Sequence, residues 1–136
     1  MAWEFKIPGT PVPWTVWARR GPAPDGYLRC EAWQAQIRAY ATQYWNGPEG
    51  PRKPIEGPVM LQMEFSLPWP KKAPQKNPQM IERWQKRNYP RRSDLRNMAK
   101  ACEDALQGIV FVNDSQVVVA GPDRKAYTLS SVGFTV

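Results

Sequence analysis

The chain has 136 residues, which is enough for one domain with its own core, and its 42% of hydrophobic residues is ordinary for a globular protein. It contains no histidine, which excludes zinc–histidine sites, histidine general bases and nucleophiles that depend on a histidine. The net charge of +7 favours an acidic partner, and nucleic acid is the commonest partner of that kind.

The cysteines and the first residues indicate the compartment. Cys30 and Cys102 form no closely spaced pair, and the N-terminal residues carry neither the basic nor the apolar segment of a signal peptide. No stretch approaches the roughly 18 apolar residues that a membrane span needs. We therefore expect a soluble cytoplasmic protein with free thiols and no membrane partner.

The first third of the chain predicts a strand, a loop and a helix. Apolar and polar residues alternate over residues 3–7, which is typical of a strand, and a proline-rich loop follows over residues 8–26. Arg19 and Arg20 lie at the tip of this loop. Apolar residues recur at helical spacing over residues 30–45, which predicts a helix with one apolar stripe. This stripe consists of Trp33, Ile37, Tyr40, Ala41 and Tyr44.

The middle of the chain predicts a strand and a basic loop. Residues 59–67 alternate more regularly than any other segment, so one face of this strand should be buried. That face consists of Val59, Leu61, Met63, Phe65 and Leu67. Two prolines end the strand, and a polar, basic loop follows over about residues 68–93. A helical turn is expected around residues 81–86 within this loop.

A second helix is predicted over residues 95–106. Ser93 or Asp94 is expected to cap its N-terminus, because the short side chains of serine and aspartate accept hydrogen bonds from the first free N–H groups of a helix. Gly108 stands where a C-terminal cap belongs.

The last segments complete the fold prediction. Residues 116–120 and 126–136 predict a hairpin around Gly121-Pro122-Asp123. The expected class is α+β, a single domain over residues 1–136 with a mixed sheet of about four strands and two main helices. The expected order is strand, helix, strand, helix, strand, strand.

Positive charge is concentrated between residues 71 and 100. This window holds ten cations and two acids, a local charge of +8, with Trp84 and Tyr89 interleaved. Such a strip suits phosphate contacts and stacking on exposed bases, and the alternative is a solvated charge run on a surface loop. The predicted DNA contacts, including the loop pair, are Arg19, Arg20, Lys71, Lys72, Lys76, Arg83, Lys86, Arg87, Arg91, Arg92 and Arg96.

The residues that follow this strip carry a recognisable motif. It resembles the RusA family of Holliday-junction resolvases, whose signature reads D-x-D-N-x-x-K, then D-A-L-x-G, then D-D-S/A-Q-V. Eleven residues match in one ungapped window of 24, and weaker similarity covers most of the remaining chain. The matching residues are Asp94, Asn97, Lys100, Asp104, Ala105, Leu106, Gly108, Asp114, Ser115, Gln116 and Val117.

The resemblance implies a RusA-like fold and a homodimer that nicks opposing strands of a four-way DNA junction. It implies Mg²⁺ held by carboxylates, with Mn²⁺ as a substitute, and a bacterial or phage-encoded protein of recombination and repair. Asp94 and Asp114 are the implied metal ligands and catalytic residues, and Lys100 is the third catalytic residue. Asn113 and Asp104 are further candidate ligands.

The residue types support the same chemistry without the resemblance. Mg²⁺ takes oxygen ligands, and Asp94 at a helix start and Asp114 before a strand could converge on one ion. Lys100 would neutralise the phosphate or protonate the leaving oxygen, with Asn97 and Gln116 in support. The alternatives are that Asp94 only caps the helix, Asp114 is a turn residue and Lys100 is solvated.

The sequence departs from the signature at two positions. Arg96 replaces the second acid of D-x-D, and Asn113 replaces the first acid of D-D. Asparagine can still ligate through its carbonyl oxygen. A guanidinium at position 96 would instead repel Mg²⁺, pair with Asp94 or Asp114, or bind phosphate. In a further alternative Arg96 points away from the site, and Glu103 or Asp104 substitutes as the ligand.

Two functions therefore stand beside each other. The first is a Mg²⁺-dependent, structure-selective endodeoxyribonuclease. The second is a catalytically impaired relative that binds branched DNA without efficient cleavage. A protein-interaction module with a basic surface is a third interpretation, but it leaves the motif matches unexplained.

Overall fold

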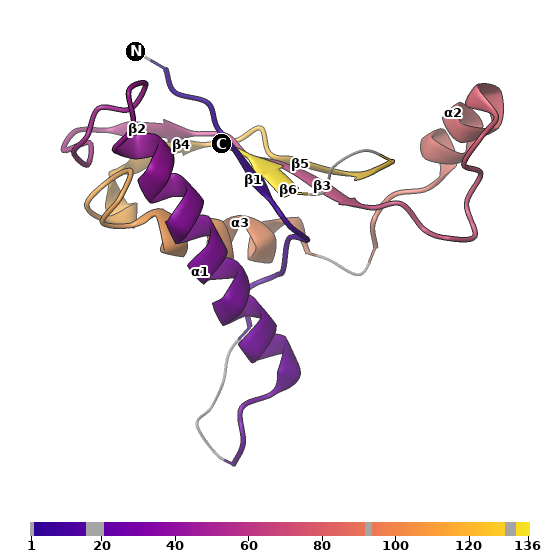
Figure 1. The fold of residues 1–136 in the computed structure, drawn as a ribbon, viewed down its shortest axis with the longest axis horizontal. Coiled ribbons are helices and arrows are strands. Elements are labelled where there is room, and N and C mark those ends of the chain that lie inside the picture. The colour runs from indigo at the N-terminus through magenta and orange to yellow at the C-terminus, as the bar shows by residue number, and fades with distance from the viewer. Residues whose placement is uncertain (1, 16–20, 92–93, 130–132) are drawn as a thin grey trace.

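The computed structural model describes residues 2–15, 21–91, 94–129 and 133–136, and it confirms the α+β class. Figure 1 shows α1 and α3 on the same face of the strands, with α2 standing away from them. The elements are β1 (Lys6–Pro8), α1 (Asp25–Trp45), β2 (Val59–Leu61), β3 (Glu64–Pro68), α2 (Pro78–Arg87), α3 (Leu95–Leu106), the 3₁₀ helix η1 (Asp114–Gln116), β4 (Val117–Ala120), β5 (Arg124–Thr128) and β6 (Gly133–Thr135).

The strands form two sheets. Four of them follow the order β1-β6-β3-β5, in which β6 runs antiparallel to β1 and β3, and β5 runs parallel to β3. The other two, β2 and β4, form a parallel pair. Since β3 follows β2 and β5 follows β4, the two parallel pairs continue each other as one kinked ribbon.

The hairpin predicted around Gly121-Pro122-Asp123 is therefore wrong. The residues before and after this tripeptide are β4 and β5, and both run parallel to the β2–β3 segment instead of folding back on each other. The tripeptide carries the chain across the kink. A Gly-Pro-Asp sequence is typical of a turn, but the pairing partners of the flanking strands decide the direction of the chain.

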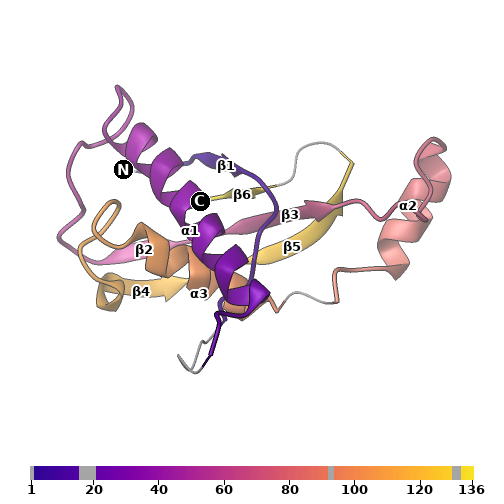
Figure 2. The same ribbon diagram turned by 60° about the horizontal axis from the view of Figure 1, so that its bottom comes forward.

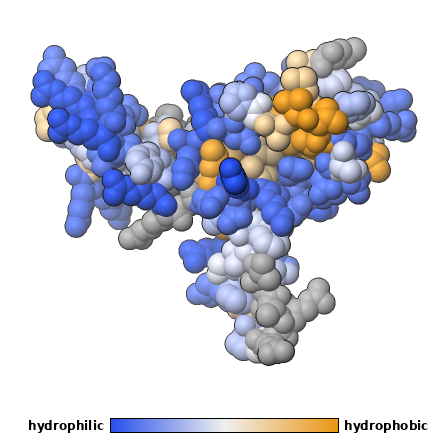
Figure 3. Space-filling model, turned by 180° about the vertical axis from the view of Figure 1, so that it is seen from behind, coloured by the Kyte–Doolittle hydropathy of each residue, from blue (hydrophilic) through white to orange (hydrophobic). Residues whose placement is uncertain are grey.

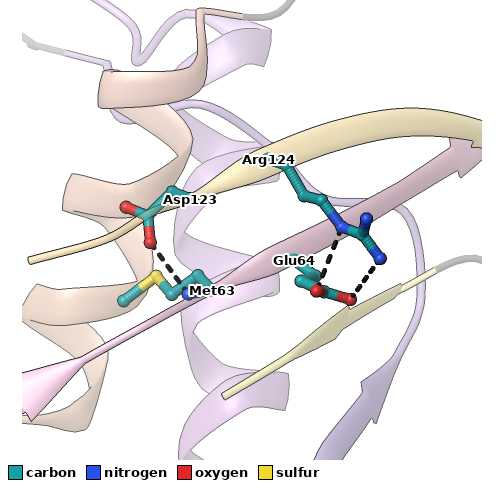
Figure 4. A network of polar contacts seen from close by, with 4 residues as sticks. All are labelled: Met63, Glu64, Asp123 and Arg124. Atoms are coloured by element: carbon teal, nitrogen blue, oxygen red, sulfur yellow. Dashed lines mark hydrogen bonds and ion pairs between the residues drawn. The ribbon is translucent and has the colours of Figure 1, made fainter.

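Hydrogen bonds hold this kink together. The Gly121 N–H donates to the Leu61 carbonyl (2.8 Å), and the Met63 N–H donates to Asp123 Oδ1 (2.8 Å). Figure 4 shows Asp123 in this position, where its side chain replaces a ladder bond between the strands. Next to it, Arg124 and Glu64 form a two-point ion pair with N–O distances of 3.0 and 3.1 Å. This pair is solvent-exposed, so it adds little stability.

The predicted alternation of residues 59–67 is confirmed. All five predicted inward residues are buried, and the chain is divided between β2 and β3. They join the apolar faces of α1 and α3 in one hydrophobic cluster. Burying one large apolar side chain contributes about 1.5–3 kcal/mol, so this cluster is the main source of stability for the fold.

Helix α1 starts five residues earlier than predicted and buries a slightly different stripe. Pro24 lies at its N-cap position, and Asp25 is in the first turn, where a negative charge is favourable. Trp45 is buried, whereas the predicted stripe residue Tyr40 is exposed and Tyr44 is half-buried. The remaining buried residues of α1 are Cys30, Trp33, Ile37 and Ala41.

Helix α3 has the predicted bounds, and Asp94 is its N-cap. It packs against α1, and the Gln34 amide of α1 donates to the Ala101 carbonyl (2.9 Å). Cys30 and Cys102 are free, as expected. Both are buried, and burial raises the pKa of both thiols. The buried residues of α3 are Met98, Ala101, Cys102, Ala105 and Leu106.

Residues 69–91, which we call the arm, project from the end of β3. Figures 1 and 2 agree that α2 stands apart from the sheet at the tip of this segment. A single turn was predicted here, but α2 has ten residues because Asn77 caps it and Pro78 starts it. None of the residues of α2 is buried. Trp84 contacts the ring of Tyr127 in the body (5.4 Å between ring centroids) and, within the arm, the ring of Trp69 (4.8 Å).

Four residues used in the predictions lie outside the described residues: Arg19, Arg20, Arg92 and Ser93. In the described ranges, no helix combines the length and apolarity that crossing a membrane requires.

Candidate nucleic-acid interface and acidic site

Asp94 caps helix α3. One of its carboxylate oxygens, Oδ1, accepts hydrogen bonds from the N–H groups of Arg96 (2.8 Å) and Asn97 (3.2 Å). All three side chains are exposed. The structural interpretation of Asp94 as a cap is therefore confirmed, and metal ligation would have to use its second oxygen.

Lys100 lies against an aromatic ring. Its Nζ is 3.8 Å from the ring centroid of Trp14. The backbone N–H of Trp14 donates to the backbone carbonyl of Asn97 (2.9 Å). The loop after β1 thus docks on the first two turns of α3. Lys100 is exposed and Trp14 is half-buried. A cation over an aromatic ring at such an exposed site is stabilised by about 0.5–1 kcal/mol, so this contact orients the ammonium without neutralising it. Sequence reasoning missed Trp14, because nothing along the chain relates it to residue 100.

Asp114 lies at the other end of α3. Its N–H donates to Oε1 of Gln107 (3.3 Å), and Gln107 is the C-cap of this helix. The helix has 12 residues. At a rise of about 1.5 Å per residue it separates its two ends by roughly 18 Å. Asp94 and Asp114 therefore lie near opposite ends of α3.

Asn113 and Gln116 hold the turn that carries Asp114. Asn113 Oδ1 accepts from the Ser115 N–H (2.9 Å), and Gln116 Oε1 accepts from the N–H groups of Val112 (2.8 Å) and Asn113 (2.9 Å). The Gln116 amide also donates to two carbonyls before β2, those of Ile55 and Gly57. Gln116 thus has a structural role. The side-chain oxygen of Asn113 caps the 3₁₀ helix η1.

Two acids on α3 have perturbed pKa values. Partial burial raises the pKa of Glu103 above its ordinary value, and the negative charges of Asp114, Asp104 and Asp123 raise it further. Burial also raises the pKa of Asp104; Lys100 opposes this shift and Asp114 adds to it. The C-terminal half of α3 is therefore an acidic region in which the carboxylates repel one another.

A cavity of about 400 Å³ lies between α3 and the β4–β5 kink. Two cations, Arg96 and Lys100, and two acids, Glu103 and Asp123, line it together. Asp123 was not among the predicted site residues. It lies outside the motif and next to a turn-like Gly-Pro pair, so only the three-dimensional structure places it here.

These acids do not form a metal site as they stand. Among the described residues, no group of three or more cysteine, aspartate or glutamate side chains could hold a metal ion. The predicted pair, Asp94 and Asp114, is separated by the length of α3, and Asp123 already accepts a backbone hydrogen bond. The binding of a shared Mg²⁺ by the predicted ligand set therefore stays a prediction from the family resemblance.

The predicted DNA-contacting cations lie at the surface. Every described member of the set is exposed, from the arm to the first turn of α3. Within the described residues, Lys86 has an ion pair with Glu82 (3.1 Å), and the Arg91 guanidinium lies 5.3 Å from the ring centroid of Tyr89. The arm itself holds seven cations and one acid. Its electrostatic character is suited to a polyanion.

A comparison with models of known protein families finds one match. A family model described as endodeoxyribonuclease RusA matches residues 23–131, a range that runs from the start of α1 to beyond β5. It includes the arm, the whole of α3 and the acidic turn. No curated protein matches the chain. The extent of the family match shows that this chain belongs to the RusA family of endodeoxyribonucleases.

Proposed function

We propose that this protein binds four-way DNA junctions through the arm and the N-terminal half of α3, and that it cleaves them slowly. The observation that carries the proposal is the exposed basic surface of the arm, which leads directly into α3. Protein cations that bind DNA phosphates release the condensed counterions, and this release drives binding. The affinity therefore falls as the salt concentration rises.

Arg96 and Lys100 extend this surface from the arm to the cavity beside α3. A guanidinium suits bidentate contact with a phosphate, and an ammonium held over Trp14 supplies a second positive charge nearby. These two side chains would position a DNA backbone along α3. Asp94, at the start of the same helix, would then lie beside the bound strand.

The proposal that cleavage is slow rests on the acidic residues of α3 and of the turn that follows it. The family and the retained Asp94 favour an endodeoxyribonuclease, but Arg96 replaces one acid and Asp114 lies at the far end of the helix. A requirement for Mg²⁺, with Mn²⁺ as a substitute, remains a prediction from the family resemblance. The second candidate, binding without efficient cleavage, is favoured by the same two observations.

A labelled synthetic four-way junction, titrated with Mg²⁺ and then Mn²⁺, separates the two candidates. Cleavage supports the first, and a gel shift without cleavage supports the second. Asp94→Asn should abolish cleavage and leave junction binding equal or stronger, because asparagine still caps the helix. Asp25→Asn, in the first turn of α1, is the matched control. Absence of junction binding at low salt would refute both candidates.

Arg96→Asp tests the altered position directly. If Arg96 occupies a former ligand position, the change should increase cleavage at low Mg²⁺ while weakening metal-free junction binding, since an anion replaces a cation. Arg96→Gln controls for the loss of the cation alone. If the aspartate variant loses DNA affinity and its metal dependence stays the same, Arg96 is a phosphate contact only.

We further propose that the protein acts as a homodimer that meets the two-fold symmetry of the junction. Figure 3 shows hydrophobic surface gathered over the β2–β4 end of the molecule. The exposed large apolar residues of these two strands are Met60, Val118 and Val119, and Val112 precedes them in the turn before β4; the four are 44–76% exposed. Val118→Glu should produce a monomer in sedimentation experiments, whereas Leu28→Glu, an exposed apolar position on α1, should leave the mass unchanged. A wild-type monomer at micromolar concentration would contradict the proposal.

A further inference from the structure

A cleft of about 740 Å³ separates the arm from the body. On the arm side it is lined by Trp84, Tyr89 and Arg91, and on the body side by Tyr127 of β5 and Pro11 of the N-terminal loop. Its volume lies in the range of sites that take small organic groups. None of the described residues that line it is acidic, and Arg91 contributes a positive charge to its wall.

The aromatic residues of this cleft have different roles. Trp84 is half-buried between Trp69 and Tyr127, so it is committed to holding the arm. Tyr89 is 61% exposed, and its described ring contact is with the guanidinium of Arg91. This pair offers a planar apolar surface next to a positive charge that is free of a described carboxylate partner.

We propose that this cleft binds an unpaired nucleobase of branched DNA, stacked on Tyr89, with the adjoining phosphate contacting Arg91. A flat ring and a neighbouring cation match the two parts of a nucleotide, its base and its phosphate. A base within a continuous duplex is stacked on both faces and cannot enter. The cleft would therefore favour DNA with open bases at a branch point over uniform duplex. This inference rests on the proposed DNA-binding function and specifies which structural feature of the branch is recognised.

The test uses a three-way or four-way junction with 2-aminopurine at an unpaired position beside the branch. Stacking quenches the fluorescence of this base, so binding of the wild-type protein should lower the signal. Tyr89→Ala should abolish the quenching and reduce the preference for the unpaired-base junction over a fully paired junction by about 5- to 150-fold. Tyr89→Phe should retain both effects, because the ring is kept. Tyr40→Ala, an exposed aromatic on α1, should change neither.

Arg91→Gln separates the two halves of the site. It should weaken binding to the unpaired-base junction and reduce the salt dependence of that binding by about one unit, while the fully paired junction loses less affinity. If the wild-type protein shifts the junctions but does not change the 2-aminopurine signal, the cleft is not a base-binding site, while the proposed DNA binding stands. If no junction is bound at low salt, the proposed function fails and the inference fails with it.

Discussion

The arm and the body of this protein are built in opposite ways. The body buries apolar residues from two helices and from the β2–β3 segment in one cluster, whereas no residue of α2 is buried. The arm carries seven cations and one acid, and the acids with perturbed pKa values lie in the body. The segments that stabilise the fold and the segment proposed to contact DNA are thus largely different. Helix α3 is the exception, because one face belongs to the core and the other to the candidate site.

The largest effect is expected from a substitution in the body. Phe111 is fully buried, and Phe111→Ala should lower the free energy of unfolding by about 3–5 kcal/mol. Met80→Ala, on the arm, removes an apolar side chain that is 53% exposed and should change stability by less than about 0.5 kcal/mol. Urea denaturation followed by circular dichroism measures both. Similar losses would show that the arm is part of the cooperative unit.

A smaller effect is expected where the two regions meet. Trp84→Ala removes two aromatic contacts, each worth about 0.5–1.5 kcal/mol, so the arm should open locally. Amide hydrogen exchange should accelerate in α2 and stay slow in α3, and junction affinity should fall by about tenfold. Trp84→Phe keeps a ring and should restore most of the affinity. Protection lost equally in both helices would mean that the separation of the regions is incorrect.

A single cation of the arm should have a modest effect that depends on salt. If Arg83 contacts a phosphate, Arg83→Ala should flatten the slope of log K against log salt by about 0.9 units, with no change in melting temperature. Arg29→Ala, on the exposed side of α1, is the control and should leave the slope unchanged. Fluorescence anisotropy between 50 and 200 mM salt provides the measurement. Equal slopes for all three proteins would place Arg83 outside the DNA contact.

The smallest effect concerns the pH dependence of the body. The pKa of Glu103 is raised above its ordinary value of 4.5, so the folded state binds this proton more tightly than the unfolded state does. Stability from this group is present below that value and is lost as the pH rises through the folded pKa. Glu103→Gln should therefore reduce the fall in melting temperature between pH 4 and 7, relative to the wild type and to Glu49→Gln in an exposed loop. An unchanged fall would contradict the assigned cause.

The sequence predicts best what depends on local patterns. The alternation of residues 59–67 predicts the buried face of two strands. The preference of aspartate for the N-cap position predicts where α3 starts, and Asp94 accepts hydrogen bonds from the first free N–H groups of this helix. The early start of α1 was missed, because the Pro and Gly residues around Asp25 are also typical of a loop.

Contacts between distant segments could not be predicted in the same way. The hairpin around residues 121–123 is wrong because strand pairing over long range overrides a local turn signal. The motif relates Asp94 to Asp114 along the chain, but the helix between them separates their side chains. Asp123 lines the cavity together with Arg96 and Lys100 because the kink between β4 and β5 brings it there. No periodicity in the sequence predicts that position.

The parallel pairing of β3 with β5 has a consequence for how this chain can change over generations. The arm and α3 lie inside the segment that this pairing closes. The entropy cost of closing a flexible loop grows only with the logarithm of its length, by about 0.6 kcal/mol for each doubling. Insertions or deletions at the tip of the arm, away from Trp84, therefore cost the body little. The basic arm is a segment whose length can change while the core stays the same.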